Sequence, residues 1–404
     1  MPSADTPNPR RSWTRLDGVD LLRGLAIFFV LMNHVNMRLR SVEVPYTHGL
    51  PDQLVSSLVW NGQRGVQMFF AISGFLITAT TLRRWGSLSK VNIRDFYLLR
   101  FARIAPLLLM LLAVLSIFHL VHLKYFVVAP KTGGLGRALI AALTFHVNLL
   151  EAHRGYLPAN WDILWSLSVE EMFYLVFPLA CFLIGRSKLL IGLLLTFVIL
   201  GPFGRTVFTS GNEVWREYSY LGGMDAIALG CLTALFASRV SLSSRLLRIL
   251  ATIGTTILIF SLCFSNWAND LGLRRNGLDM TLVAAGTCMI IAASAQTRWS
   301  SAPTIRPLLN LGQNSYEIYL THMFVVFACS QSFLLAGKRI ELVPIFFIAV
   351  VLVSGLFGKA VAQLYSEPMN RFLRKRWQQT PHRLGSMVDN RMEGNCPDAA
   401  AAES

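Results

Sequence analysis

LDGVDLLRGLAIFFVLMNHVNM, residues 16–37, is the stretch that decides the fold. It is apolar and long enough to cross a bilayer as a helix, yet it carries Asp20, Arg23, Asn33 and His34. An ionisable side chain at bilayer depth costs a few kcal/mol, so such residues usually face the interior of a helix bundle and have a function there. The stretch therefore predicts a membrane helix bundle with a polar site inside it.

Arg23 and His34 are expected to lie on the same face of this helix. At about 100° per residue, their spacing in the sequence brings them back to within roughly 20° of one direction. Along the axis they are about 16 Å apart, so the arginine lies near one membrane surface and the histidine lies deeper. Two alternatives remain: either Asp20 pairs with Arg23 and His34 bonds a neighbouring helix, or both cations face a functional site.

The whole chain has the composition of a membrane protein. Of its 404 residues, 53% are hydrophobic and 15% are charged, a balance that suits a membrane protein better than a soluble domain. The formal net charge is +15, but lysines and arginines occur in short runs between apolar segments, which indicates membrane topology rather than nucleic-acid binding. The six cysteines are scattered singly without CxxC spacing, so we expect neither a disulfide framework nor a metal site.

Eleven apolar segments are predicted along the chain. They lie at residues 18–37, 65–82, 101–122, 138–150, 162–184, 188–206, 220–237, 247–266, 278–296, 313–335 and 341–364. The first is interpreted as a retained span rather than a signal peptide, because it is longer than a signal-peptide core and lacks a cleavage pattern. The short fourth segment is expected to be re-entrant or to lie at the outer surface, because every later basic loop then falls on the cytoplasmic side.

The predicted fold class is therefore all-α, a polytopic membrane bundle of about ten transmembrane helices and one short helix. Both termini are expected in the cytoplasm, and the protein in the bacterial cell membrane. Residues 1–15 are predicted as a cytoplasmic tail, 16–377 as the membrane domain and 378–404 as a disordered cytoplasmic tail.

Polar side chains from several segments are predicted to reach a similar depth. They are Ser73, Glu170, Glu171, Tyr319 and His322. Adjacent glutamates on a helix point about 100° apart, so at most one of them aims straight at a shared site. Simpler interpretations stay open: Ser73 beside Gly74 is typical of a close helix contact, and His322 can be a hydrogen-bonded core histidine.

Two arginines mark the predicted cytoplasmic end of the third span. FYLLRFARIAP contains Arg100 and Arg103, which share a helix face at this spacing. They either orient the protein and bind anionic lipid headgroups, or they form a site for phosphates, whose oxygens match the arginine fork.

Six strings now occur in one order along the chain, over roughly residues 16–371. They are LRGLAIFFVLMNH, FFAISGFLI, FYLLRFARIAP, WSLSVEEMFYLVFP, GQNSYEIYLTH and YSEPMNR. With these strings the chain resembles the integral-membrane acyltransferase family 3, whose bacterial members O-acylate surface polysaccharides, lipid-linked sugars, Nod factors and macrolide sugars. One departure precedes Asp225: relatives often carry an arginine there, and this chain has Gly222 and Gly223. We expect the membrane form without the soluble hydrolase-like domain that some relatives carry.

The resemblance implies transfer of an acyl group, expected to be acetyl, from cytoplasmic acyl-CoA to a hydroxyl of a carbohydrate or glycolipid acceptor. Acyl-CoA is then a co-substrate, and no bound cofactor is expected. His34 is the general base for the acceptor hydroxyl or else a transient acyl carrier. Glu170 or Glu171 is expected to orient the imidazole, as a carboxylate does in a catalytic triad.

The resemblance also gives the remaining polar residues a place along the path of the donor. Arg100 and Arg103 are expected to contact the phosphates of the donor, with Arg23 further along the path. The side chains expected to line the pocket are Ser73, Tyr319 and His322.

A function of another class remains open from the residues alone. In a proton-coupled transporter or flippase of a glycan or glycolipid, the same histidines and carboxylates would form a proton relay. Such a protein moves an unmodified substrate and depends on the proton gradient, whereas an acyltransferase releases CoA and leaves a heavier acceptor.

Overall fold

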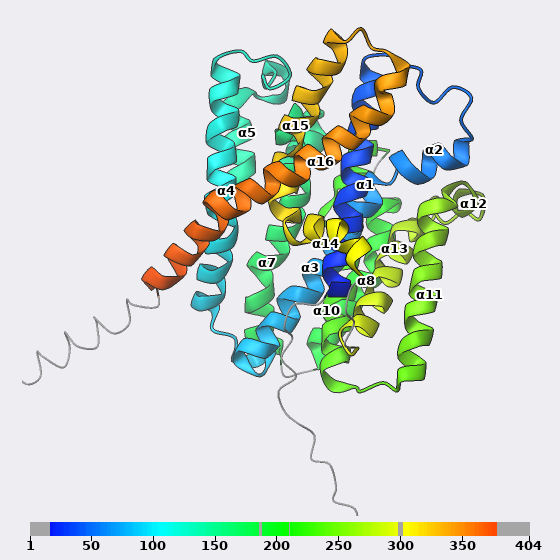
Figure 1. Cartoon of the computed structure of the whole chain (residues 1–404). Helices are drawn as coiled ribbons and strands as arrows, with labels where there is room; N and C mark the ends of the chain where they lie inside the picture. The colour runs from blue at the N-terminus through cyan, green and yellow to red at the C-terminus, as the bar shows by residue number, and fades with distance from the viewer. Residues whose placement is uncertain (1–16, 186–187, 210, 298–301, 378–404) are drawn as a thin grey trace, which may run out of the picture.

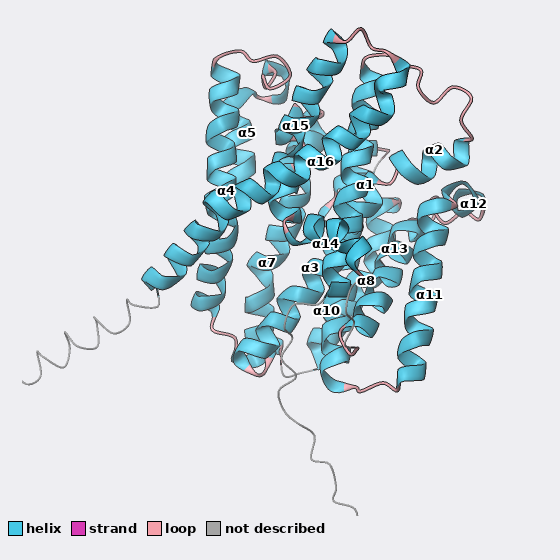
Figure 2. Cartoon of the chain, in the orientation of Figure 1, coloured by secondary structure: helices cyan, strands magenta, loops and turns pink. Residues whose placement is uncertain are grey.

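The computed structural model describes residues 17–185, 188–209, 211–297 and 302–377. Over these residues the chain is a bundle of α-helices with no strand (Figure 2). The predicted tails at residues 1–15 and 378–404 lie outside the described residues. The orientation with both termini in the cytoplasm stays a prediction.

The helices follow one another with short connections. They are α1 (Asp17–Ser41), α2 (Asp52–Val59), α3 (Gly62–Trp85), α4 (Ile93–Leu120), α5 (Gly134–Leu143), α6 (Val147–Arg154), α7 (Leu164–Ile184), α8 (Lys188–Arg205), α9 (Glu213–Tyr218), α10 (Tyr220–Arg239), α11 (Ser244–Cys263), α12 (Ser265–Asp270), α13 (Leu278–Ser294), α14 (Arg306–Gln313), α15 (Ser315–Leu335) and α16 (Val343–Val361). After α16 a π-helical segment, Ala362–Ser366, leads into a further helix that runs to Trp377.

Nine helical segments within the described residues are long and apolar enough to cross a membrane. This confirms the prediction of an all-α polytopic bundle, and the chain is a multi-pass membrane protein. The one remaining predicted span, residues 278–296, corresponds to α13, which has 17 residues and is shorter than the nine.

The short fourth apolar segment folds as two helices, α5 and α6, instead of one. Phe145 lies between them with a φ of 56°, a left-handed conformation that an α-helix of L-residues does not continue through. Helix α5 has 10 residues and is therefore about 15 Å long, roughly half the hydrocarbon thickness of a bilayer. It is too short to span, in agreement with the exclusion of this segment from the predicted spans.

Helix α1 occupies the middle of the bundle (Figure 1), where it packs against α3, α14 and α15. Helix α3 in turn packs against α10, and α10 against α8 and α13. Helices α4 and α11 lie toward opposite edges in Figure 1. The polar residues of α1 are thus surrounded by other helices, which supplies them with partners away from lipid.

Two glycines set the distance between α3 and α10. A Cβ atom on Gly74 would lie 2.0 Å from the carbonyl oxygen of Ile227, and one on Gly230 would lie 2.0 Å from that of Ala71. Only glycine fits at such distances, and the two backbones can therefore touch. In the pair Ser73 and Gly74, the glycine is the close helix contact, which leaves Ser73 for a polar role.

Candidate active site

Two histidines from distant parts of the chain meet inside the bundle. His34 of α1 and His322 of α15 have ring centroids 4.8 Å apart in an edge-to-face arrangement, and Nε2 of His322 lies 3.3 Å from Nδ1 of His34. The side chain of His322 is fully buried, whereas His34 is partly exposed to a cavity. The structure brings the two predicted residues into contact. His322, however, was expected to line the pocket, and its buried side chain is part of the wall of neither cavity described below.

The backbone around the two rings determines which ring nitrogen carries the proton. Nδ1 of His34 lies 2.8 Å from the carbonyl oxygen of Val30, and Nδ1 of His322 lies 2.7 Å from that of Tyr319. A carbonyl oxygen can only accept, so both Nδ1 atoms carry the hydrogen when the rings are neutral. Nε2 of His322 then accepts from Nδ1 of His34, and Nε2 of His34 keeps a lone pair that can take a proton.

Two cavities in the bundle share part of their walls. The large cavity has a volume of about 1470 Å³ and includes His34 in its wall. The second, which we call the arginine pocket, has a volume of about 410 Å³ and includes Arg23 in its wall. Val66, Phe70 and Tyr319 line both. Helix α1 therefore connects the two cavities, with Arg23 at one and His34 at the other.

Tyr319 stands where the two cavities adjoin, and its hydroxyl is fixed there. It donates a hydrogen bond to the carbonyl oxygen of Ile163 over 3.1 Å and lies 2.6 Å from Oγ of Ser166. The sequence predicted Tyr319 as a pocket-lining residue, and the structure places it on the wall of both cavities.

Glu170 and Glu171 of α7 lie at Arg100 of α4. Nη2 of Arg100 lies 3.1 Å from Oε1 of Glu170 and 2.9 Å from Oε1 of Glu171. The sequence predicted that one glutamate orients the imidazole of His34, but the polar groups at that ring are those of Val30 and His322. The reason is electrostatic, because a guanidinium buried beside two carboxylates attracts them more strongly than a neutral ring does.

Glu170 also accepts hydrogen bonds from the hydroxyl groups of two neighbours. Oγ of Ser73 donates to Oε1 of Glu170 over 2.7 Å, and the hydroxyl of Tyr174 donates to the same oxygen over 2.6 Å. The guanidinium of Arg100 lies over the Tyr174 ring, 3.6 Å from its centroid. This cluster forms one wall of the arginine pocket.

Arg103 and Arg23 are held by partners on and near α15. Nη1 of Arg103 lies 3.2 Å from Oε1 of Glu317, and Nε of Arg23 donates to Oγ of Ser315 over 3.1 Å. Nη1 of Arg23 lies 3.9 Å from Oδ1 of Asp20. Arg23 therefore pairs with Asp20 and also lines the arginine pocket, while its contact with a donor stays a prediction.

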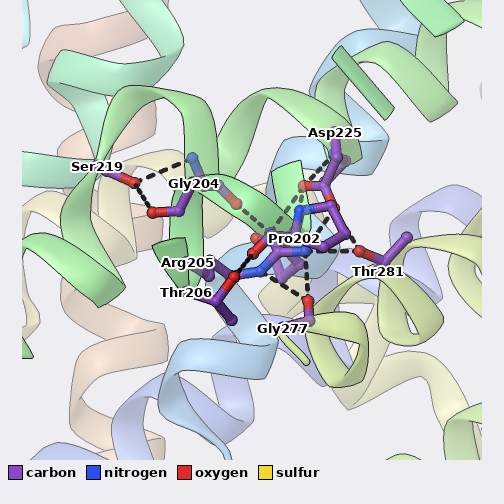
Figure 3. Close-up of polar contacts among 11 residues, drawn as sticks. Pro202, Gly204, Arg205, Thr206, Ser219, Asp225, Gly277 and Thr281 are labelled. Atoms are coloured by element: carbon purple, nitrogen blue, oxygen red, sulfur yellow. Dashed lines mark hydrogen bonds and ion pairs between the residues drawn. The ribbon is translucent and has the colours of Figure 1, made fainter. Parts of the chain in front are cut away.

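The sequence analysis missed a further charged residue, Arg205 of α8, which is buried with Asp225 of α10 (Figure 3). Nη2 of Arg205 lies 2.7 Å from Oδ2 of Asp225. The same nitrogen donates to the carbonyl oxygen of Gly277 and to Oγ1 of Thr281. Gln67 of α3 donates to Oδ1 of Asp225 over 3.0 Å. One ion pair thus ties α8, α10, α3 and the start of α13 together.

Arg205 also explains the departure from the family pattern before Asp225. The chain has Gly222 and Gly223 where relatives often carry an arginine, and Nη1 of Arg205 donates to the carbonyl oxygen of Gly222. The aspartate thus obtains its cation from another helix. A usable sequence signal existed, because Arg205 and Asp225 are both ionisable residues within predicted apolar segments, 188–206 and 220–237.

The polar groups that the two cavities offer include an imidazole and several arginines. Within the described ranges, no three His, Cys, Asp or Glu side chains gather closely enough to hold a metal ion. His34 has an unprotonated ring nitrogen and lines the large cavity, and Arg23 on the same helix lines the arginine pocket.

Comparison with known proteins places this geometry in a family. A family model described as an acyltransferase domain matches residues 16–359. The chain is 24% identical over 379 residues to a Staphylococcus aureus protein named O-acetyltransferase OatA, covering 88% of this chain and 57% of that one. It is 26% identical over 358 residues to the Listeria monocytogenes peptidoglycan O-acetyltransferase OatA, covering 78% and 50%.

A third relative is a Bacillus subtilis protein named putative peptidoglycan O-acetyltransferase YrhL, with 24% identity over 332 residues, 77% of this chain and 48% of that one. The chain thus spans about half the length of the curated relatives it matches. No solved structure matches it.

Proposed function

Because this chain belongs to the acyltransferase family that its residues 16–359 match, we propose that it is a membrane O-acyltransferase acting on a hydroxyl of a carbohydrate. The names of the relatives support acetyl as the group transferred and a cell-wall glycan as the kind of acceptor. The observation that carries the proposal is the free Nε2 of His34 at the wall of the large cavity, on the helix that also reaches the arginine pocket.

His34 acts on the acceptor in this proposal. As general base, its Nε2 takes the proton of the acceptor hydroxyl while the oxygen attacks the thioester carbon and the carbon–sulfur bond breaks. The imidazolium that forms keeps its Nδ1 hydrogen on Val30 and His322, and it returns the Nε2 proton to the leaving thiolate. In the alternative, Nε2 itself attacks the thioester carbon, the carbon–sulfur bond breaks and CoA leaves as the thiolate. The acceptor hydroxyl then attacks the acetyl carbon, the carbon–nitrogen bond breaks, and Nε2 takes the hydroxyl proton and passes it to the thiolate.

His322 is proposed as the positioning residue for His34. Replacing His322 with alanine is expected to lower kcat by about tenfold to a hundredfold, the worth of a hydrogen bond to a charged group, with little change in the KM of either substrate. His322→Gln, which keeps an acceptor atom on the side chain, should retain more activity than His322→Ala. Steady-state kinetics of the two variants in nanodiscs provide the test, and equal losses in both would contradict a positioning role.

The arginine pocket is proposed to receive the acyl-CoA donor. Its walls combine apolar side chains, which suit a thin acyl and pantetheine arm, with arginines, whose forks suit phosphate oxygens. The lining arginines are Arg23, Arg83, Arg84, Arg100, Arg103 and Arg374. Arg100 and Arg103, expected from the sequence to hold the phosphates, already contact carboxylates. We therefore assign them to the inner wall, and the exposed Arg84 and Arg374 to the first contact with the phosphates.

Arg374→Ala is expected to raise the KM for acetyl-CoA roughly tenfold without changing kcat, because a charge-assisted contact to phosphate is lost in the ground state and the transition state alike. The matched control is Arg371→Ala, on the same helix. Arg371 is exposed, pairs with Glu367 over 2.9 Å and is not part of the pocket wall. Equal KM values for both variants would contradict the proposed entrance.

The activity itself is tested by giving the reconstituted protein acetyl-CoA and chitooligosaccharide or peptidoglycan fragments. The expected result is CoA and acetyl ester in equal amounts, measured by thiol titration and mass spectrometry. Transport of an unmodified glycan without CoA release would contradict the proposal and favour a transporter.

A further inference from the structure

The wall of the large cavity carries an arginine one helical turn beyond His34. Arg38 follows His34 by four residues on α1, so both side chains project from the same helix face. Both residues line the large cavity. A group bound at Arg38 is therefore about one turn, roughly 5 to 6 Å along the axis, from a group bound at His34. The two side chains can contact different parts of one small ligand.

The contacts of Arg38 are all with neutral groups. Nε donates to Oγ of Ser330 over 2.8 Å, and Nη1 donates to Oγ of Ser41 over 3.2 Å. The guanidinium carbon lies 4.3 Å from the centroid of the Tyr125 ring and 5.3 Å from that of Phe327. These partners hold the fork in place on two sides, but none of them neutralises its charge.

One nitrogen of the same fork has no partner. Nη2 of Arg38 is buried and has no hydrogen bond to any residue that the structure describes. Nη2 itself is closed to the cavity, so a ligand oxygen reaches it only after a shift of the side chain. What favours an anionic ligand is the charge of the Arg38 guanidinium at the cavity wall, because the contacts given above include no carboxylate. Arg38, followed by Lys124, also lowers the pKa of the Tyr125 hydroxyl by polar contact.

A second arginine on the cavity wall has the same feature. Nη1 of Arg64, near the start of α3, donates to Oδ1 of Asn61 over 2.9 Å. Its Nε atom is buried and has no partner within the described part of the chain. Arg64 also lines the large cavity. Two arginines from different helices therefore present buried donors that their own protein surroundings leave unused.

The cavity also carries an aromatic surface. Trp165 and Tyr218, both in its wall, stack with centroids 4.1 Å apart and an interplanar angle of 6°. Tyr156 lies edge-on to Tyr218 and lines the same cavity. Trp165 and Tyr218 are buried, and Tyr156 is the exposed ring of the three. An exposed, rigid ring of this kind can pack on the apolar C–H face of a sugar.

We propose that the large cavity binds an anionic sugar acceptor, with a carboxylate or phosphate of the acceptor on the fork of Arg38 and a hydroxyl of the same molecule at Nε2 of His34. The proposal deepens the acyltransferase function and rests on it. The arginine fork holds one end of the ligand and thereby limits which hydroxyl reaches the base. Arg38 is in this sense a specificity-determining residue.

The test uses three probes built on one ring: N-acetylglucosamine, which is neutral, N-acetylmuramic acid, which adds a carboxylate, and N-acetylglucosamine 1-phosphate. With the wild-type protein in nanodiscs, both anionic probes are expected to have a KM about tenfold to a hundredfold below that of the neutral probe. The two anionic arms distinguish a carboxylate ligand from a phosphate ligand. In Arg38→Gln the KM for both anionic probes should rise to that of the neutral probe, so that the preference disappears.

Arg38→Lys keeps the charge without the fork and should fall between the wild type and Arg38→Gln. Arg339→Gln is the matched control, because Arg339 is an exposed arginine in a surface pair with Glu341. Direct binding of the three sugars, measured by saturation-transfer NMR without acetyl-CoA, separates the two proposals. If wild type and Arg38→Gln bind the anionic sugars equally well, the inference fails. If binding follows Arg38 but no probe is acetylated in the presence of acetyl-CoA, the proposed function fails instead.

Discussion

Replacing His34 with alanine is expected to lower the rate of acetyl transfer by about 10²- to 10⁴-fold, the usual contribution of a positioned general base. The reason is that the variant removes the Nε2 lone pair at the wall of the large cavity. The arginine pocket should stay intact, because Arg23 is held by Ser315 and the imidazole of His34 is not part of that pocket wall. The KM for acetyl-CoA should therefore change little, whereas kcat should fall by the factor given above.

His48→Ala is the matched control for this variant. His48 is an exposed histidine in the loop after α1 and is not part of the wall of either cavity. Its replacement should leave CoA release unchanged, and both variants should elute as folded protein after solubilisation. A His34→Ala protein that inserts, folds and transfers acetyl at the wild-type rate would exclude His34 as base and as acyl carrier.

Replacing Arg205 with alanine is expected to destabilise the bundle by about 3–5 kcal/mol, because it leaves the buried carboxylate of Asp225 without its cation. The effect should reach beyond α8, since this pair also contacts Thr281 of α13 (Figure 3) and Gln67 of α3. Thermal unfolding of the detergent-solubilised protein, followed by tryptophan fluorescence, measures it as a lower midpoint temperature.

Two further variants identify the cause of that loss. Removing both charges, Arg205→Met with Asp225→Leu, should be less destabilising than Arg205→Ala alone, because no unpaired charge then remains in the bundle. Arg339→Ala removes an arginine from an exposed pair and should shift the midpoint little. If Arg205→Ala unfolds at the temperature of Arg339→Ala, the buried pair does not hold the helices together.

The helical bundle could be predicted from the sequence because its signal is local. An apolar run of spanning length must become a helix, since lipid offers no partner to its backbone. The break between α5 and α6 is also determined locally, but its signal in the sequence is weak. The fourth segment is one apolar run in the sequence. In the structure, α5 ends before Phe145, which has a left-handed backbone conformation. A phenylalanine does not predict such a conformation.

The residues of the site could be predicted individually, but their pairing could not. Periodicity on α1 placed Arg23 and His34 on one face, and the structure puts each at a cavity. The spacing of residues within one helix cannot say which other helix lies opposite. The glutamates were therefore assigned to His34, although Arg100 of α4 lies nearer to them in the fold.

The ion pair of Arg205 and Asp225 is another pairing that the spacing within one helix could not predict. Its two members lie on different helices, and the sequence places glycines where relatives often have the arginine. The ion pair arises only because α8 and α10 pack side by side. A search for every single charge inside a predicted span, followed by matching of opposite signs, would have suggested it.

In the proposed function, an acetyl group passes from a donor in the arginine pocket to an acceptor in the large cavity on the other side of the membrane, with His34 as general base or as acyl carrier. Proteoliposomes with acetyl-CoA only in the compartment that the arginine pocket faces and a neutral chitooligosaccharide only in the other test it most directly. We expect acetylated sugar in the acceptor compartment and free CoA in the donor compartment, with neither in liposomes that contain His34→Ala. Acetylation only when sugar and acetyl-CoA share one compartment would contradict the claim.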